Sequence, residues 1–284
     1  MICKSYLICN LTVTVFIYDL PHKALFYVIV VSLQQILSIM NATNERTVAE
    51  LVTNDYRTAD VFKKFGIDFC CGGKVTVEEI CVKKNISYNQ LTEELNRIGQ
   101  IVQTTDTNFN EWSLDKLANY IVEKHHGYVT SNLELIRQYA DKVALVHGAH
   151  RPETKAIARL YNEVADELAH HLEKEEIILF PYVNQLAAAK RNNVKIQAPH
   201  FGTVKNPITM MEAEHEFAGD HFHQIAALSD QYTAPPEACN TYRVLYAKLK
   251  EFEDDLHTHI HLENNILFPK AKQLEQEVVA QAHL

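Results

Sequence analysis

The stretch His171-Leu-Glu-Lys-Glu175-Glu-Ile-Ile-Leu-Phe-Pro181 decides the fold, because it returns in outline as His259-Ile-His-Leu-Glu263-Asn-Asn-Ile-Leu-Phe-Pro269. In both copies a histidine precedes a glutamate by four residues, and Ile-Leu-Phe-Pro follows after two more residues. Side chains four residues apart lie on the same face of a helix, about one turn from each other. The repeat therefore indicates two related helices, each carrying a His–Glu pair on one face.

Four long segments of the chain have helical periodicity, and the repeat lies in the second and the fourth. Their predicted bounds are 113–140, 152–190, 207–229 and 236–277. Prolines stand at the predicted starts of the last three, where the missing N–H is not needed. Short connections between four such helices predict an all-α fold, an antiparallel up-down four-helix bundle.

In each segment a histidine interrupts the apolar face, and two of the faces also carry a glutamate. One residue of helix is about 100° of rotation, so the period separates the histidines on these faces from the neighbouring ones. We expect the histidines that lie off the apolar faces to be at the surface or hydrogen-bonded to a ligand. They include His126, His170, His257 and His261. Glu214 is expected to be a solvated charge or to support a ligand. The candidate metal ligands are His125, His171, Glu175, His215, His259 and Glu263.

Six ionisable groups in a bundle core need compensation, because an unpaired buried carboxylate costs several kcal/mol. A single core histidine is more often hydrogen-bonded than ligating, but six matched groups favour metal. Imidazole and carboxylate together suit iron, manganese or zinc, and the lack of a core cysteine argues against structural zinc. Two glutamates at the centre can bridge two ions, with two histidines completing each.

Composition limits the classes of partner. The chain has 284 residues, 47% of them hydrophobic, and a formal net charge of −9. This charge argues against nucleic acid or an anionic membrane surface as a partner. The histidines are concentrated, with most of the fifteen lying between His125 and His261.

The N-terminal region differs from the rest. We predict a doubtful apolar leader at 1–39, a small helical domain at 40–98, a linker at 99–111, the bundle at 112–277 and a tail at 278–284. The apolar run 24–33 is shorter than the about 20 residues that span a bilayer, and it lacks a clear cleavage site. We expect the natural protein to begin at Met40, with a signal peptide or membrane anchor as alternatives.

Two adjacent cysteines mark the small domain, in the turn Cys70-Cys71-Gly72-Gly73. In one interpretation the turn is structural, with small buried thiols behind two flexible glycines. In the other the thiols pass electrons or iron, or contact a partner, and this would require a lowered thiol pKa. Cys81 and Cys239 are assigned to packing. Reduced thiols indicate a reducing compartment.

The His, His-x-x-x-Glu, His, His-x-x-x-Glu pattern resembles a hemerythrin-like domain. Together with Phe69-Cys70-Cys71-Gly72-Gly73, it resembles the iron–sulfur cluster repair di-iron proteins, the RIC family. The resemblance implies two non-haem iron ions, bridged by carboxylates and an oxo group. It also implies a cytoplasmic bacterial protein that repairs iron–sulfur clusters damaged by nitrosative or oxidative stress, by supplying iron.

Two other functions remain open at the same di-iron centre. One is a reductase of nitric oxide or dioxygen, with Cys70 and Cys71 supplying electrons. The other is a sensor that binds the gas reversibly. The expected partners are therefore damaged or apo iron–sulfur proteins and a small gas ligand, and a homodimer is left open.

Overall fold

The computed structural model describes residues 46–55, 57–70, 72–99 and 108–279, and the backbone of residues 2–8 and 11–17. The chain divides into two compact units, Met1–Arg46 and Thr47–Leu284. In the first unit β1 (Ile2–Ile8) pairs antiparallel with β2 (Leu11–Ile17). The apolar run 24–33 and Cys71 lie outside the described residues. No helix in the described part of the chain is long and apolar enough to cross a membrane.

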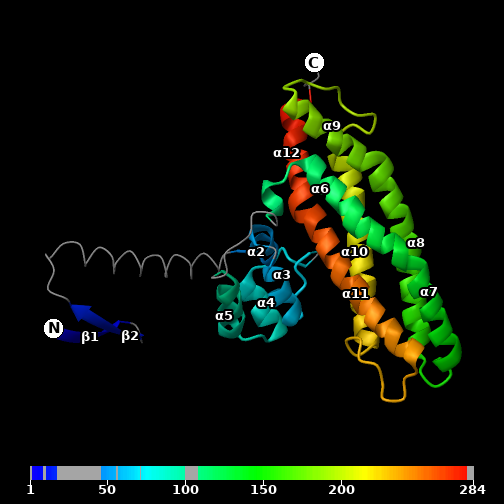
Figure 1. The fold of residues 1–284 in the computed structure, drawn as a ribbon, viewed down its shortest axis with the longest axis horizontal. Helices are drawn as coiled ribbons and strands as arrows, with labels where there is room; N and C mark the ends of the chain where they lie inside the picture. The colour runs from blue at the N-terminus through cyan, green and yellow to red at the C-terminus, as the bar shows by residue number, and fades with distance from the viewer. Residues whose placement is uncertain are drawn as a thin grey trace. The chain divides into compact units, whose positions relative to one another are not determined.

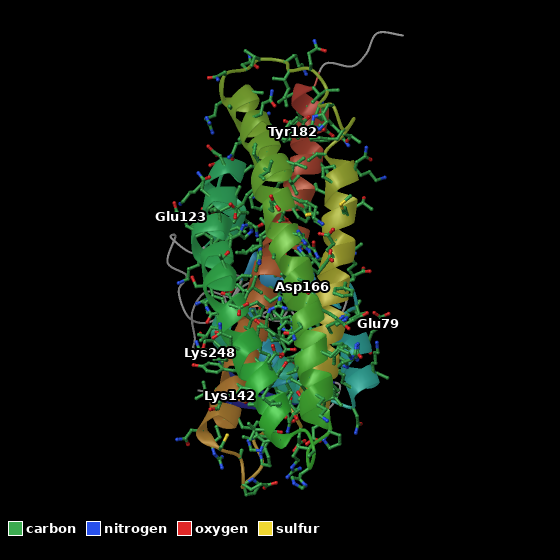
Figure 2. All side chains as sticks on the ribbon, turned by 90° about the vertical axis from the view of Figure 1, so that its right-hand side faces the viewer. Glu79, Glu123, Lys142, Asp166, Tyr182 and Lys248 are labelled. Carbon is green, nitrogen blue, oxygen red and sulfur yellow. The ribbon has the colours of Figure 1, made fainter. Side chains whose placement is uncertain are left out.

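The second unit contains the predicted antiparallel bundle of four helical rods (Figure 1). Tyr182 and Lys142 lie toward opposite ends of this bundle (Figure 2). Rod A comprises α6 (Leu114–Ile121), η3 (Val122–His126) and α7 (Gly127–His147). Rod B comprises α8 (Glu153–Lys174), η4 (Glu175–Leu179) and α9 (Phe180–Arg191), and rod C is α10 (Lys205–Leu228). Rod D comprises α11 (Asn240–Leu262), η5 (Glu263–Leu267) and α12 (Phe268–Val278).

Rods A, B and D each contain one turn of π-helix, the elements η3, η4 and η5. In rods B and D this turn comes just before Pro181 and Pro269. Proline lacks an N–H and its ring clashes with the carbonyl four residues earlier, so the helix widens before it. The sequence predicts one helix for each of these segments and does not indicate the π-turns within them. The expected start of the last helix near Pro236 is wrong, because α11 begins at Asn240.

The bundle has two hydrophobic cores. One includes the rings of Tyr161, Phe222 and Phe252 and draws on α7, α8, α11 and the second half of α10. The other includes Leu117 and Phe268 and draws on α6, α9, α12 and the first half of α10. Burial of each large apolar side chain contributes on the order of 2 kcal/mol. Every rod passes from one core to the other at its predicted ligand residues, so these residues form a polar layer between the two cores.

A small group of helices precedes the bundle, with a hydrophobic core of its own. It comprises α2 (Val48–Asn54), α3 (Thr58–Lys64), α4 (Val77–Lys84) and α5 (Tyr88–Gly99), and the short η2 (Phe109–Glu111) leads into rod A. Thr47 and Thr76 each form a capping box with the glutamate three residues later, which fixes the starts of α2 and α4. These helices and the bundle belong to one compact unit, so the predicted boundary at 99–111 stays a prediction.

Glu253, on α11, is a partly buried acid whose ionisation should make stability depend on pH. Burial raises the pKa of Glu253 from 4.5 to about 7, against a smaller opposing effect of the Tyr232 hydroxyl. Between these values the folded state keeps a proton that the unfolded state has lost, so stability falls as pH rises. We expect Glu253→Gln to raise the free energy of unfolding by about 2–3 kcal/mol at pH 8 and to leave it nearly unchanged at pH 4.5.

The measurement is chemical denaturation of wild type and variant, both freed of metal, across that pH range. A stability difference that does not grow between pH 4.5 and pH 8 would contradict the raised pKa of Glu253.

Candidate metal centre

Six side chains from the four rods meet in the polar layer between the cores, and none is more than 2% exposed. They form two overlapping groups that share both glutamates. Nε2 of His215 lies 3.1 Å from Oε2 of Glu263, and Nε2 of His259 lies 3.0 Å from Oε1. Glu263 therefore reaches both groups with its two oxygens. The groups are His126, Glu175, His259 and Glu263, and His171, Glu175, His215 and Glu263.

Five of the six predicted ligands meet in this cluster, but rod A contributes His126 instead of His125. Nε2 of His126 lies 3.4 Å from Glu175 Oε2 and 4.0 Å from Glu263 Oε1. Nδ1–H of His125 instead donates to Asp255 at 3.0 Å, and its ring stacks on that of His259. The π-turn η3 explains this difference. It brings His126, the fifth residue after Ile121, onto the inner face, whereas a regular helix would bring His125, the fourth.

Three of the four histidines in the cluster have their outer nitrogen fixed by a neighbouring rod or turn. Nδ1–H of His126 donates to Glu176 at 2.8 Å, that of His171 to Glu214 at 2.8 Å, and that of His215 to Asn264 at 3.0 Å. Such bonds fix the tautomer and direct the Nε2 lone pair inward, which strengthens metal binding. Glu214, which also pairs with Lys174, therefore holds the His171 ring and is not a freely solvated charge. The sequence offered no reason to choose Glu176, since it is off the stripe.

The inward-facing atoms fit a metal better than they fit each other. Within the part of the chain that the structure describes, both oxygens of Glu175, Oε2 of Glu263 and Nε2 of His126 are buried without a hydrogen-bond partner. Nε2 of His171 and Nε2 of His215 face each other at 3.1 Å. Buried atoms without a partner, together with two ring nitrogens this close, are what ligand atoms converging on a common ion would show. Two carboxylates with four imidazoles suit iron, manganese or zinc.

Without a metal, protons must neutralise the two buried carboxylates. Burial alone would lower the pKa of His126, but the nearby carboxylates of Glu175 and Glu263 outweigh burial and raise the pKa to about 10. The pKa of His171 is raised to about 10 in the same way, because Glu175 outweighs burial. The layer thus provides a strong negative potential where cations would sit, and metal binding there would release protons.

The cysteine turn is held by Asp68. Its Oδ1 accepts from the backbone N–H of Cys70 at 2.8 Å, and its Oδ2 accepts from that of Gly72 at 2.8 Å. Gly73 is required, because a Cβ there would lie 2.4 Å from the Phe69 carbonyl oxygen. Cys70 is 2% exposed and packs in the bundle core that contains Phe252.

The three other thiols named in the sequence differ in position. Cys71 lies outside the described residues, so its role stays a prediction. Cys81 is buried in the small domain, as its assignment to packing requires. Cys239 is exposed, with Sγ 3.3 Å from Nε2 of His147, so its assignment to packing is wrong.

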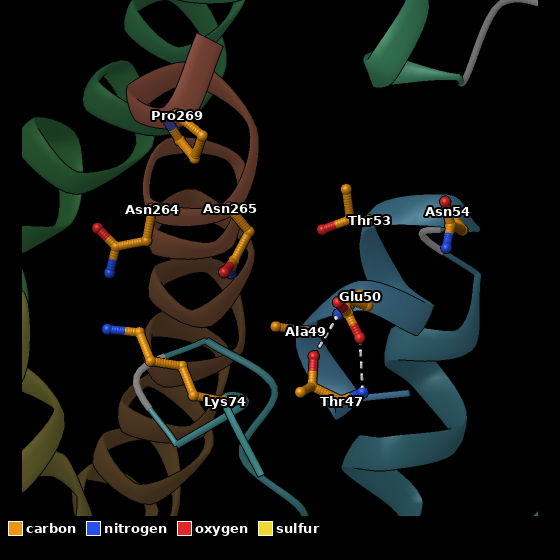
Figure 3. Close-up of a pocket in the computed structure, with 9 residues that line it drawn as sticks. All are labelled: Thr47, Ala49, Glu50, Thr53, Asn54, Lys74, Asn264, Asn265 and Pro269. Atoms are coloured by element: carbon orange, nitrogen blue, oxygen red, sulfur yellow. Dashed lines mark hydrogen bonds between the residues drawn. The ribbon is translucent and has the colours of Figure 1, made fainter. Parts of the chain in front are cut away.

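A pocket of about 280 Å³ lies between α2 and the η5 turn. Figure 3 shows Asn264 and Asn265 on the bundle side, Thr53 and Glu50 on the α2 side, and Lys74 below. Asn264 also accepts a hydrogen bond from His215, so one residue of the pocket contacts the cluster directly.

Two family models match the chain. A domain of unknown function, DUF542, matches residues 44–99. The hemerythrin HHE cation binding domain matches residues 117–271. The second match spans every member of the cluster.

Curated relatives match over most of their length. The chain is 33% identical over 230 residues to the iron–sulfur cluster repair protein ScdA of Staphylococcus haemolyticus, covering 80% of this chain and 98% of the relative. It is 34% identical over 227 residues to the iron–sulfur cluster repair protein YtfE of Musicola paradisiaca, covering 80% and 96%. A YtfE of Escherichia coli is 32% identical over 231 residues, covering 81% and 98%.

His125 and His126 are adjacent histidines that test the π-turn. We expect His126→Gln to weaken metal binding at least about 10-fold, because it removes a nitrogen that faces both glutamates, whereas His125→Gln keeps two metal ions per chain. Elemental analysis after dialysis against a competing chelator measures this. The opposite order of effects would return the ligand role to His125.

Glu214 should matter for metal affinity although it touches no metal. Glu214→Ala is expected to lower affinity about 10–100-fold, the range typical of a lost ligand-supporting hydrogen bond. The matched control is Glu212→Ala, two residues earlier on α10, whose carboxylate pairs with Lys272 at 3.1 Å. Equal affinities of the two variants in a chelator competition would show that the Glu214–His171 bond does not tune the site.

Proposed function

We propose that this chain, which belongs to the hemerythrin HHE cation-binding family and to the iron–sulfur cluster repair proteins, carries two non-haem iron ions and restores damaged iron–sulfur clusters by supplying iron. The observation that carries this proposal is the buried layer of four histidines and two shared glutamates. Its partners would be iron–sulfur proteins that have lost iron through nitrosative or oxidative damage, in the bacterial cytoplasm.

The residues of the layer divide the work of holding such a pair. Glu175 and Glu263 each face histidines of both groups, so each is placed to bridge. His126 and His259 would complete one end, and His171 and His215 the other. When bound, the ions would supply the metal that a broken cluster lacks, together with a coordination position for nitric oxide or dioxygen.

The apolar surroundings of the layer favour a buried site that stores iron over an open catalytic cleft. Every ligand side chain is at most 2% exposed, and hydrophobic cores lie on both sides of the layer. Metal leaving such a site requires the supporting side chains to move. Glu176 is 45% exposed and Glu214 13%, so the rim of the site reaches solvent at the outer nitrogens of His126 and His171.

The bridging assignment is tested by the double variant Glu175→Leu/Glu263→Leu. We expect loss of both metal ions, with the metal-free bundle as stable as wild type or more so, since apolar groups fill a core without desolvation cost. A matched control is Glu173→Leu/Glu216→Leu, which replaces two exposed glutamates on α8 and α10. Metal content is measured on protein purified without oxygen. Full metal content in the first variant would refute the bridges.

The same proteins test the repair function. Wild type loaded with isotopically labelled iron should restore the cluster of an apo iron–sulfur acceptor and leave its label there, and the bridging variant should do neither. Consumption of nitric oxide with formation of nitrous oxide, and no transfer of label, would support the reductase instead. Reversible gas binding without transfer or turnover would support the sensor.

A further inference from the structure

The small domain contacts the outer face of α11 through Phe69. This ring is 1% exposed and meets the rings of His257 and His261 edge-on, at centroid distances of 5.9 and 5.7 Å. His257 and His259 are two residues apart, about 200° of helix rotation, so they point to nearly opposite faces. The seam is therefore separated from the polar layer by the helix itself.

A second group of metal-binding side chains lies in this seam. One ligand atom each of Asp68, Cys70 and His257 lies within 4.8 Å of the others. Sγ of Cys70 is 3.0 Å from Oδ1 of Asp68. A tetrahedral ion with bonds of about 2.0–2.3 Å holds its ligand atoms about 3.5 Å apart. The three atoms thus need only small side-chain adjustments to share one ion.

The three residues come from two elements that the fold fixes independently. Asp68 and Cys70 belong to a turn in which the Asp68 carboxylate accepts hydrogen bonds from the backbone N–H groups of Cys70 and Gly72. A residue larger than glycine does not fit at position 73 of this turn. His257 belongs to the rigid helix α11. Asp68 can keep its hydrogen bonds to the turn when it binds a metal, because a carboxylate oxygen has lone pairs for both an N–H and a metal.

We propose that Asp68, Cys70 and His257 form a second metal site that takes a single divalent ion of intermediate softness, Fe²⁺ or Zn²⁺. A thiolate, an imidazole and a carboxylate are the donor set that such ions prefer. On binding, the Cys70 thiol releases its proton to solvent and no electron is transferred. Solvent or a donor of another molecule takes the fourth position, because Asp68 and His257 are both partly exposed. The site does not depend on the proposed repair function.

Cobalt(II) distinguishes this site from the di-metal centre, which contains no sulfur ligand. Metal-free full-length protein titrated with Co²⁺ without oxygen should develop a cobalt–thiolate charge-transfer band. We expect Cys70→Ser to abolish the band, and Cys71→Ser, Cys81→Ser and Cys239→Ser to retain it. His257→Gln and Asp68→Asn leave every thiol in place and should weaken the affinity at least about 10-fold. Circular dichroism confirms that each variant is folded.

The Glu175→Leu/Glu263→Leu protein separates the two proposals, because it should keep the thiolate band while losing the di-metal centre. Absence of the band from wild type would overturn the second site. Its survival in Cys70→Ser, or its loss in Cys71→Ser, would also overturn it by moving the thiolate to another residue. None of these results changes the metal count of the di-metal centre. A failure of the second-site proposal can therefore be told apart from a failure of the proposed function.

Discussion

The structure depends on how four histidines and two glutamates can be buried together in a helical bundle. Hydrophobic cores on both sides exclude water from the layer, and this makes each unpaired charge costly. The same exclusion strengthens every attraction within the layer. The rods are therefore held in register by mutual charge compensation at their midpoints, while the apolar stripes on either side provide most of the burial.

The π-turns adapt regular helices to this layer. Within each core, the buried residues of a rod follow the regular helical period. The π-turn adds one residue, and this changes which face of the helix is buried in the next core. Pro181 and Pro269 explain two of the turns through ordinary proline sterics. The third precedes Gly127, and nothing in its composition indicates it. The two cores and the polar layer between them could thus be predicted from the period, but the phase within rod A could not.

Period and repetition in the sequence were sufficient for the bundle and for five of the six cluster residues. In a regular helix His125, four residues after the buried Ile121, lies on the inner face, and for this reason the period predicts His125 and not His126. The stripe followed backward through Ile136, Asn132 and Val129 reaches His126 by a step of three and His125 by a step of four, and this ambiguity was the available signal. Side chains that support ligands across rods, such as Glu176 and Glu214, depend on tertiary packing that periodicity does not encode. The docking of Phe69 on α11 is non-local for the same reason.

Asn264 links the metal-binding cluster thermodynamically to the pocket beside α2. Its side chain accepts a hydrogen bond from His215 and also lines the pocket beside α2. Any molecule whose binding in that pocket displaces the amide changes the metal affinity by some factor. Reciprocity of free energies then requires the bound metal to change the affinity for that molecule by the same factor. A loaded and an empty protein would in that way present different surfaces to whatever docks there.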